Sequence, residues 1–133
     1  MQRSALALTA AAAIAGACGS EGQGHTHAEL GDPTGMACPE GGTSLNYAEF
    51  GRPFMEAYCI SCHSDDVVGA NRQGAPSDHN FDTQFECQAF ADHLDRMSGS
   101  GPEATNTQMP PKEPRPSPQE RQMLSEWLAC GAP

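Results

Sequence analysis

The sequence predicts an all-α domain, and three observations support that prediction. In three segments, apolar and aromatic side chains recur every three or four residues, which is the period of a helix with one buried face. No segment shows the alternation of apolar and polar residues that is typical of a strand. Loops rich in proline and glycine separate the three segments. We therefore expect three main helices in residues 43–133, joined by loops that are long for so small a core.

Residues 1–42 precede this domain and divide into two parts. Residues 1–17 begin with a positive charge at Arg3 and continue as an uncharged apolar stretch that ends in small residues, a pattern typical of an export signal peptide. The stretch is too short to remain in a bilayer as a transmembrane helix. Residues 18–42 are rich in Gly, Pro, Thr, Ser and acidic residues, and they predict a flexible tether.

Cys18 gives the end of the signal peptide a second interpretation. The run IAGAC at 14–18 resembles a bacterial lipobox, in which the cysteine is acylated and becomes the first residue. Acyl chains on Cys18 would anchor the protein to a membrane without spanning it. Simple cleavage to a soluble periplasmic protein is the alternative. Both interpretations place the protein on the periplasmic side of a bacterial membrane, where disulfides persist.

The first helix is predicted after Ser44, where aromatic residues recur at helical spacing: Tyr47, Phe50, Phe54 and Tyr58. Pro53 suits the first turn of a helix that runs into Cys59–His63. A polar loop follows over residues 64–81.

The second helix is predicted to begin at Asp82 or Thr83 and to end before Gly99. Five side chains should line its buried side: Phe85, Ala89, Phe90, Leu94 and Met97. A proline-rich loop over residues 102–118 separates this helix from the next.

The third helix has the clearest boundaries. Ser117 is a suitable N-cap, Pro118 takes the first position, and Glu120 completes a capping box. Gly131 ends the helix. Its buried stripe is predicted to be Met123, Leu124, Trp127 and Leu128.

Cys59, Cys62 and His63 stand in C-x-x-C-H spacing at the end of the first predicted helix. A structural zinc site needs four ligands, and the chain has no second C-x-x-C. A thioredoxin-like dithiol belongs in a βαβ context, which is not predicted here. Covalent haem attachment uses two thiols for thioether bonds and an adjacent imidazole as an iron ligand, and this motif supplies all three. We therefore expect one covalently bound haem c, whose apolar faces would give the long loops a core.

The second axial ligand of the iron is predicted to be Met109. A thioether suits haem iron and raises the reduction potential relative to a second imidazole. Met55, Met97 and Met123 fall on predicted helices, where core packing is the default. Met109 lies in the loop TQMPPK, where Pro110 keeps it out of helical conformation. His79 is the rival ligand and would give a lower potential.

Four elements together resemble the small monohaem, class I-like cytochromes c: CISCH at 59–63, GAP at 74–76, MPP at 109–111, and a final helix with Trp127. The tail WLACGAP from Trp127 also resembles that of lipoprotein-type members. The resemblance implies a class I-like cytochrome c domain over 43–133, with axial ligation by His63 and Met109. It further implies that the carbonyl of Pro76 accepts a hydrogen bond from the His63 imidazole, which would orient the ring. It places Arg72 near a haem propionate.

Three cysteines remain after Cys18 and the C-x-x-C-H pair are set aside: Cys38, Cys87 and Cys130. We expect a Cys38–Cys130 disulfide, because these two residues flank the folded domain. Cys87 is then either a small buried residue or takes the place of Cys38 in the bridge.

The charge balance limits the partners. Seventeen acidic residues against seven basic ones give a net charge of −10, which excludes the basic stripe expected of a nucleic-acid-binding protein. An acidic surface suits a basic redox partner. With both axial positions filled, the leading interpretation is an electron carrier that exchanges electrons with protein donors and acceptors and is not itself an enzyme. The alternatives are a haem subunit of a larger redox enzyme and a haem-based gas or redox sensor.

Overall fold

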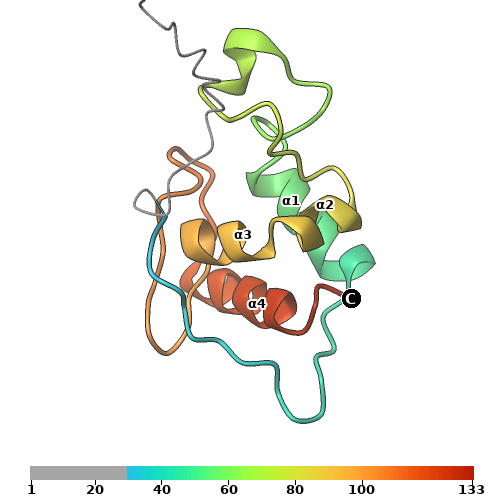
Figure 1. Ribbon diagram of the computed structural model, residues 1–133, viewed down its shortest axis with the longest axis vertical. Coiled ribbons are helices and arrows are strands. Elements are labelled where there is room, and N and C mark those ends of the chain that lie inside the picture. The colour runs from blue at the N-terminus through green and yellow to red at the C-terminus, as the bar shows by residue number, and fades with distance from the viewer. Residues whose placement is uncertain (1–29) are drawn as a thin grey trace, which may run out of the picture.

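The computed structural model describes residues 30–133, whose secondary structure is helical apart from one isolated antiparallel bridge between Ser100 and Thr105 (Figure 1). The elements in order are η1 (Tyr47–Gly51), α1 (Arg52–Tyr58), η2 (Gly69–Arg72), α2 (Gln84–Ala89), α3 (Ala91–Ser98) and α4 (Pro118–Ala129). The all-α prediction is confirmed for these residues. The predicted signal peptide, Cys18 and residues 18–29 of the predicted tether lie outside the described residues. No described helix is both long and apolar enough to cross a membrane.

The first predicted helix forms as a π-helical turn, η1, that continues directly into α1. The Asn46 side chain caps the start by accepting a hydrogen bond from the Glu49 amide at 2.9 Å. Pro53 lies in the first turn of α1, as predicted. Gly51 is needed where η1 meets α1, because a Cβ at this position would lie 2.5 Å from Cζ2 of Trp127. This close approach places the aromatic rings of Tyr47 and Phe50 against Trp127 in the last turn of α4.

The second predicted helix is instead two helices, α2 and α3, separated at Phe90. Thr83 starts α2 with a complete capping box, but Phe90 departs from helical geometry at φ −109° and ψ 23°. The ring of Phe90 packs against His79, with ring centroids 4.4 Å apart, and against Phe81 at 6.1 Å. The predicted buried side is wrong at its start, since Phe85 is 77% exposed and Ala89 is also exposed. Cys87 is the side chain of α2 that enters the core.

Helix α4 has the predicted start and lies beside α3 (Figure 1). Ser117 and Glu120 form the predicted capping box, and Pro118 is the first residue. Leu124, Trp127 and Leu128 are buried, whereas Met123 is only half-buried. The indole nitrogen of Trp127 donates to the carbonyl of Pro133 at 3.2 Å, which folds the C-terminal tail back onto α4.

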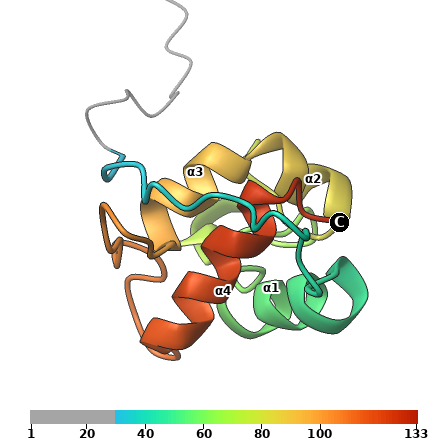
Figure 2. The same cartoon turned by 90° about the horizontal axis from the view of Figure 1, so that it is seen from below.

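Residues 30–38 are anchored to the helices by hydrogen bonds and by a disulfide, which corrects the predicted tether over this part. Figure 2 shows the segment, in cyan, crossing α3 and α4. Thr34 is fully buried, and its hydroxyl and amide both donate to the Asp95 carboxylate, at 2.7 and 3.0 Å. The Gly31 amide donates to the Arg96 carbonyl at 3.1 Å. Composition predicted a flexible segment because polar residues such as Thr34 carry no apolar pattern, although they can be held by buried hydrogen bonds.

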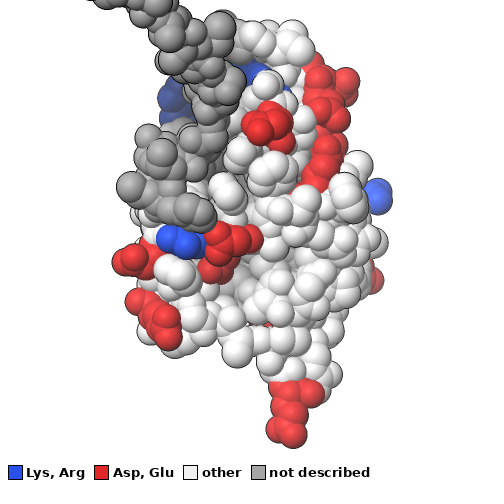
Figure 3. Space-filling view, in the orientation of Figure 1, with Lys and Arg blue, Asp and Glu red and all other residues white. Residues whose placement is uncertain are grey.

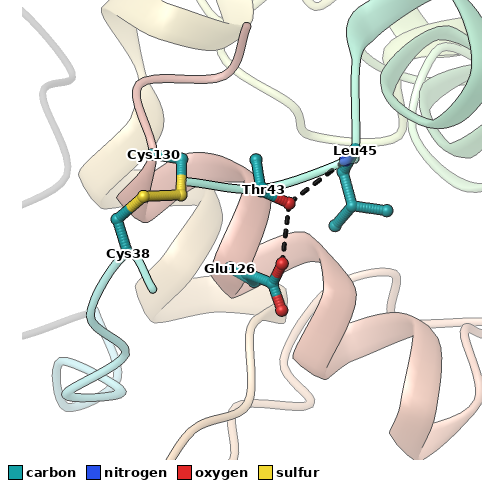
Figure 4. The surroundings of a disulfide bond; sticks show 5 residues. All are labelled: Cys38, Thr43, Leu45, Glu126 and Cys130. Atoms are coloured by element: carbon teal, nitrogen blue, oxygen red, sulfur yellow. Dashed lines mark hydrogen bonds between the residues drawn. A yellow bond between two sulfur atoms is a disulfide. The ribbon is translucent and has the colours of Figure 1, made fainter. Parts of the chain in front are cut away.

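Cys38 and Cys130 form a disulfide that closes a sequence separation of 92 residues (Figure 4). Beside it, the hydroxyl of Thr43 donates to Glu126 of α4 at 2.6 Å and accepts from the amide of Leu45 at 3.1 Å. The bridge and this pair of hydrogen bonds attach the segment before η1 to the end of α4. Cys87 stays a buried free thiol.

Candidate functional site

The residues predicted to hold a cofactor line a single cavity of about 250 Å³. Cys59, Cys62 and His63 come from the turn after α1, and Met109 comes from the loop before α4. Arg72 and Pro76 also line it, from the long loop between α1 and α2. The rest of the wall is largely apolar and includes Tyr58, Phe81, Leu94, Met97 and Pro110.

The C-x-x-C-H segment forms a tight turn at the end of α1. The Cys59 amide donates to the Met55 carbonyl at 2.9 Å and so completes the helix. The Cys59 carbonyl then accepts from the amides of both Cys62, at 3.1 Å, and His63, at 3.0 Å. This double acceptance brings both sulfurs and the imidazole to the same cavity. Burial raises the pKa of the Cys59 thiol to about 12, and the neighbouring Cys87 adds to the shift.

The His63 imidazole is oriented by contacts on its edge and its face. Its Nδ1 lies 2.9 Å from the carbonyl oxygen of His79, and its ring stacks on Phe81 with centroids 5.0 Å apart. A carbonyl can only accept, so Nδ1 carries the proton, and in the neutral ring the lone pair that a metal requires is then on Nε2. The resemblance implies that the carbonyl of Pro76 accepts the hydrogen bond from Nδ1. In the structure the carbonyl of His79 takes that place. The Pro76 carbonyl instead accepts from the Arg72 guanidinium at 2.5 Å.

Arg72 is buried, with 7% of its surface exposed, and it organises the loop beside His63. Its guanidinium donates to Asn80 Oδ1 at 2.9 Å and to five backbone carbonyls, those of Ser64, Val67, Ala75, Pro76 and His79. All three guanidinium nitrogens thus have protein acceptors. Arg72 also lines the cavity, and the contact with a propionate that the resemblance implies stays a prediction.

Met109 is held by its backbone from two helices. Its amide donates to the Met97 carbonyl of α3 at 2.9 Å. Its carbonyl accepts from the Ser98 hydroxyl and from the Arg121 guanidinium, both at 3.0 Å. Arg121 is 3% exposed and also donates to the carbonyls of Ser98 and Asn106, at 2.8 and 3.0 Å. Burial lowers its pKa. A buried arginine therefore fixes the Met109 loop, as Arg72 fixes the loop beside His63.

Three further residues line the cavity. Met97 and His93 are not among the predicted site residues, and His79 is the rival iron ligand. Met97 of α3 lines the same cavity as Met109, although its helical position suggested core packing. His93 of α3 also lines it, 5.3 Å from His79 between ring centroids. His79 is buried, and its Nδ1 lies 2.9 Å from Asp78 Oδ1. The sequence predicts that Leu94 and Met97 lie on the buried side of this helix, but nothing local shows that this side is a cavity wall.

One group of three carboxylates lies outside the cavity: Asp65, Asp82 and Glu86 have oxygens within 4.8 Å of one another. Hydrogen bonds of the loop and of the helix start account for their positions. Asp82 accepts from the Asp65 amide at 2.8 Å, and Glu86 accepts from the Thr83 amide at 2.8 Å as part of the capping box of α2.

The side chains around the cavity are of the kinds that a covalently attached haem requires. Two thiols three positions apart and an imidazole with its Nδ1 engaged come from one turn, and a thioether comes from a separate loop. The lining is largely apolar, as the faces of a porphyrin demand. Comparison with models of protein families, with curated proteins and with solved structures finds no significant match to this chain.

Proposed function

We propose that this protein is a class I-like cytochrome c that carries one haem c and acts as an electron carrier. The observation that supports this most strongly is that Cys59, Cys62, His63 and Met109 line one largely apolar cavity. These residues come from two segments nearly fifty positions apart in the chain. A C-x-x-C-H match by chance gives no reason for a loop methionine to line the same cavity.

Each residue has a distinct role in this proposal. Cys59 and Cys62 would form the thioether bonds to the haem, and His63, through Nε2, and Met109 would be the ligands of its iron. Bound haem supplies one-electron chemistry between the ferric and ferrous states. The chain orients His63 through the His79 carbonyl and fixes Met109 through Arg121. With His63 and Met109 both as ligands, the iron would have no position for a substrate.

His79 is less suited than Met109 to be the second axial ligand. The two nitrogens of an imidazole point to opposite sides of the ring. If His63 uses Nε2 for the iron, its Nδ1 points away from the iron, and the His79 backbone lies there at 2.9 Å. The His79 backbone is therefore held at the edge of the His63 ring that faces away from a metal bound at Nε2, which makes His79 less suited to be the second ligand.

The proposed setting is the periplasmic side of a bacterial membrane, with the protein exported and anchored through a lipid on Cys18. Its partners would be redox proteins, and the net charge of −10 favours donors and acceptors with basic docking surfaces. No role for nucleic acid is proposed.

The test is to export the protein in a host that attaches haem c, and to compare Met109→Ala with Met97→Ala. We expect one covalently bound haem by pyridine haemochrome assay and by mass. We expect Met109→Ala to abolish the long-wavelength ferric charge-transfer band typical of methionine ligation and to lower the reduction potential. Met97→Ala is the matched control, because it removes another cavity methionine, and it should keep the band.

Four results would count against parts of this proposal. A colourless protein whose mass includes no tetrapyrrole would contradict the proposed haem. Loss of the band in Met97→Ala, but not in Met109→Ala, would identify Met97 as the iron ligand. Avid binding of carbon monoxide by the reduced wild type favours the sensor, and copurification with a large catalytic subunit favours the redox-enzyme subunit.

A further inference from the structure

The carbonyl oxygen of His79 accepts hydrogen bonds from two donors, and one of them is a buried cation. His63 Nδ1 lies 2.9 Å from this oxygen, and Arg72 Nη2 lies 3.1 Å from it. The guanidinium cannot swing away easily, because its other nitrogens donate to Ser64 and Ala75 at 2.7 and 3.2 Å. The loop therefore fixes the position of the Arg72 guanidinium relative to His63.

Sharing the carbonyl with a cation weakens the bond that His63 can make. A hydrogen bond from Nδ1 to a strong acceptor gives the imidazole anionic character and makes it a better electron donor to a metal. Arg72 draws electron density from the same oxygen, so the oxygen is a poorer acceptor for Nδ1. A buried positive charge close to the site also disfavours the more positive, ferric state of a bound haem. Both effects favour the reduced state.

We propose that Arg72 is a positioning residue that sets the reduction potential by sharing the His79 carbonyl with His63, so that the potential is higher with Arg72 than without it. The proposal rests on the proposed haem ligation by His63. It gives Arg72 a role that acts through the His63 imidazole, in addition to the contact with a propionate that the resemblance implies.

The experiment uses the haem-loaded protein and measures two properties for each variant. One is the midpoint potential. The other is the chemical shift of the His63 Nδ1 proton in the reduced, ¹⁵N-labelled protein, which moves downfield as its hydrogen bond strengthens. Arg72→Met removes the cation and keeps much of the side-chain length. Arg96→Gln is the matched control, since Arg96 also donates to a backbone carbonyl, that of Gly31 at 2.9 Å, but does not line the cavity.

We expect Arg72→Met to shift the redox equilibrium at least tenfold towards the oxidised form, a drop of about 59 mV for a one-electron couple. The Nδ1 proton should move downfield. Arg96→Gln should change neither property. Arg72→Met will also lower the denaturant midpoint, because buried carbonyls lose their donor, but a purely structural role would leave the Nδ1 proton where it is.

Arg72→Lys provides the test if Arg72→Met does not fold. Lysine keeps the charge and can donate to some of the same carbonyls, so both properties should change in the same direction by a smaller amount. A folded variant at position 72 whose potential and Nδ1 proton match the wild type would overturn the proposal. A wild-type protein that binds no haem would instead overturn the proposed function, so the two failures are distinguishable.

Discussion

Arg72 and Arg121 are buried, at 7% and 3% exposure, and each fixes a loop that carries or supports a proposed iron ligand. Burying a guanidinium is unfavourable unless its donors are satisfied. Both side chains meet this demand with backbone carbonyls of irregular loops, which have few helical or sheet partners of their own. Each arginine therefore supplies donors to several carbonyls of its loop at once, although some of them, such as those of His79 and Met109, also accept from a second group.

Cys87 gives a prediction on the alkaline side. It is fully buried, and burial, with Glu86 nearby, raises its pKa from 9.0 to about 12. An unfolded chain ionises this thiol above pH 9, whereas the folded protein keeps it protonated. The free energy of unfolding should therefore fall between pH 9 and about 12, by up to about 1.4 kcal/mol per pH unit from this group.

Cys87→Ala should remove that contribution from the pH slope. The measurement is urea unfolding of wild type and Cys87→Ala at pH 8, 10 and 11. The pKa of Tyr47 and of Tyr58 is also raised, so a residual slope is expected in both proteins. Parallel slopes for the two proteins would contradict a buried, protonated thiol.

At the residue scale, the sequence predicts the cavity residues that are defined by a short motif and misses those defined by loop conformation. Cys59, Cys62 and His63 are fixed by spacing, and Met109 by its position in a proline-stiffened loop. Which carbonyl faces His63 Nδ1 depends on how residues 64–80 fold around Arg72, and no local pattern encodes that. His79 therefore holds the place expected of Pro76.

At the scale of elements, the loop between α3 and α4 is held in place by Arg121. Arg121→Gln should leave the carbonyls of Ser98, Asn106 and Met109 short of a donor, at a cost of about 2–4 kcal/mol in unfolding free energy. A loosened loop exposes the proposed Met109 position to competing ligands. We expect the affinity of the ferric protein for added imidazole to rise at least tenfold, measured by optical titration.

Arg96→Gln is the control for this effect. It removes an arginine of α3 whose side chain donates to the carbonyl of Gly31 and not to the loop between α3 and α4. If imidazole binds both variants with equal affinity, Arg121 does not hold the loop. Equal stability of Arg121→Gln and wild type would likewise argue against the three hydrogen bonds.

Helix boundaries that depend on caps are predictable here, and the internal break is not. Thr83 and Ser117 each form a capping box with a glutamate three positions on, so local sequence defines both starts. The break at Phe90 has no glycine or proline to mark it. It follows from the packing of the Phe90 ring on Phe81 and His79, which come from another segment. Periodicity places Met97 on the buried side of α3 together with Leu94, but it does not indicate that this side faces a cavity.

At the scale of the whole molecule, the Cys38–Cys130 disulfide should contribute stability without affecting the cavity. Closing a separation of 92 residues lowers the entropy of the unfolded chain, worth about 4–5 kcal/mol in the chain-entropy model. We expect Cys38→Ala with Cys130→Ala to lose that amount in urea unfolding and to keep the wild-type reduction potential, since neither residue lines the cavity. A changed potential would mean that the bridge also shapes the site. Mass mapping of a Cys87 disulfide in the wild type would show the alternative pairing.

The charge of the whole molecule predicts how salt affects electron exchange. Acidic side chains lie in several groups on the face in Figure 3, with few basic ones, and Arg72 and Arg121 are buried among the six basic residues of the described part of the chain. At low salt such a surface attracts cations and repels anions over about 10 Å or more. The rate of oxidation by the cation tris(phenanthroline)cobalt(III) should therefore fall as ionic strength rises, and the rate with the anion ferricyanide should rise. Stopped-flow measurements with both oxidants separate this from general salt effects, which change both rates in the same direction.

The charge-neutralising variant Asp65→Asn/Asp66→Asn should make both rates depend less on ionic strength if the carboxylates near the C-x-x-C-H turn guide the encounter. If the salt dependence stays at wild-type strength in that variant, electrons leave through a different face.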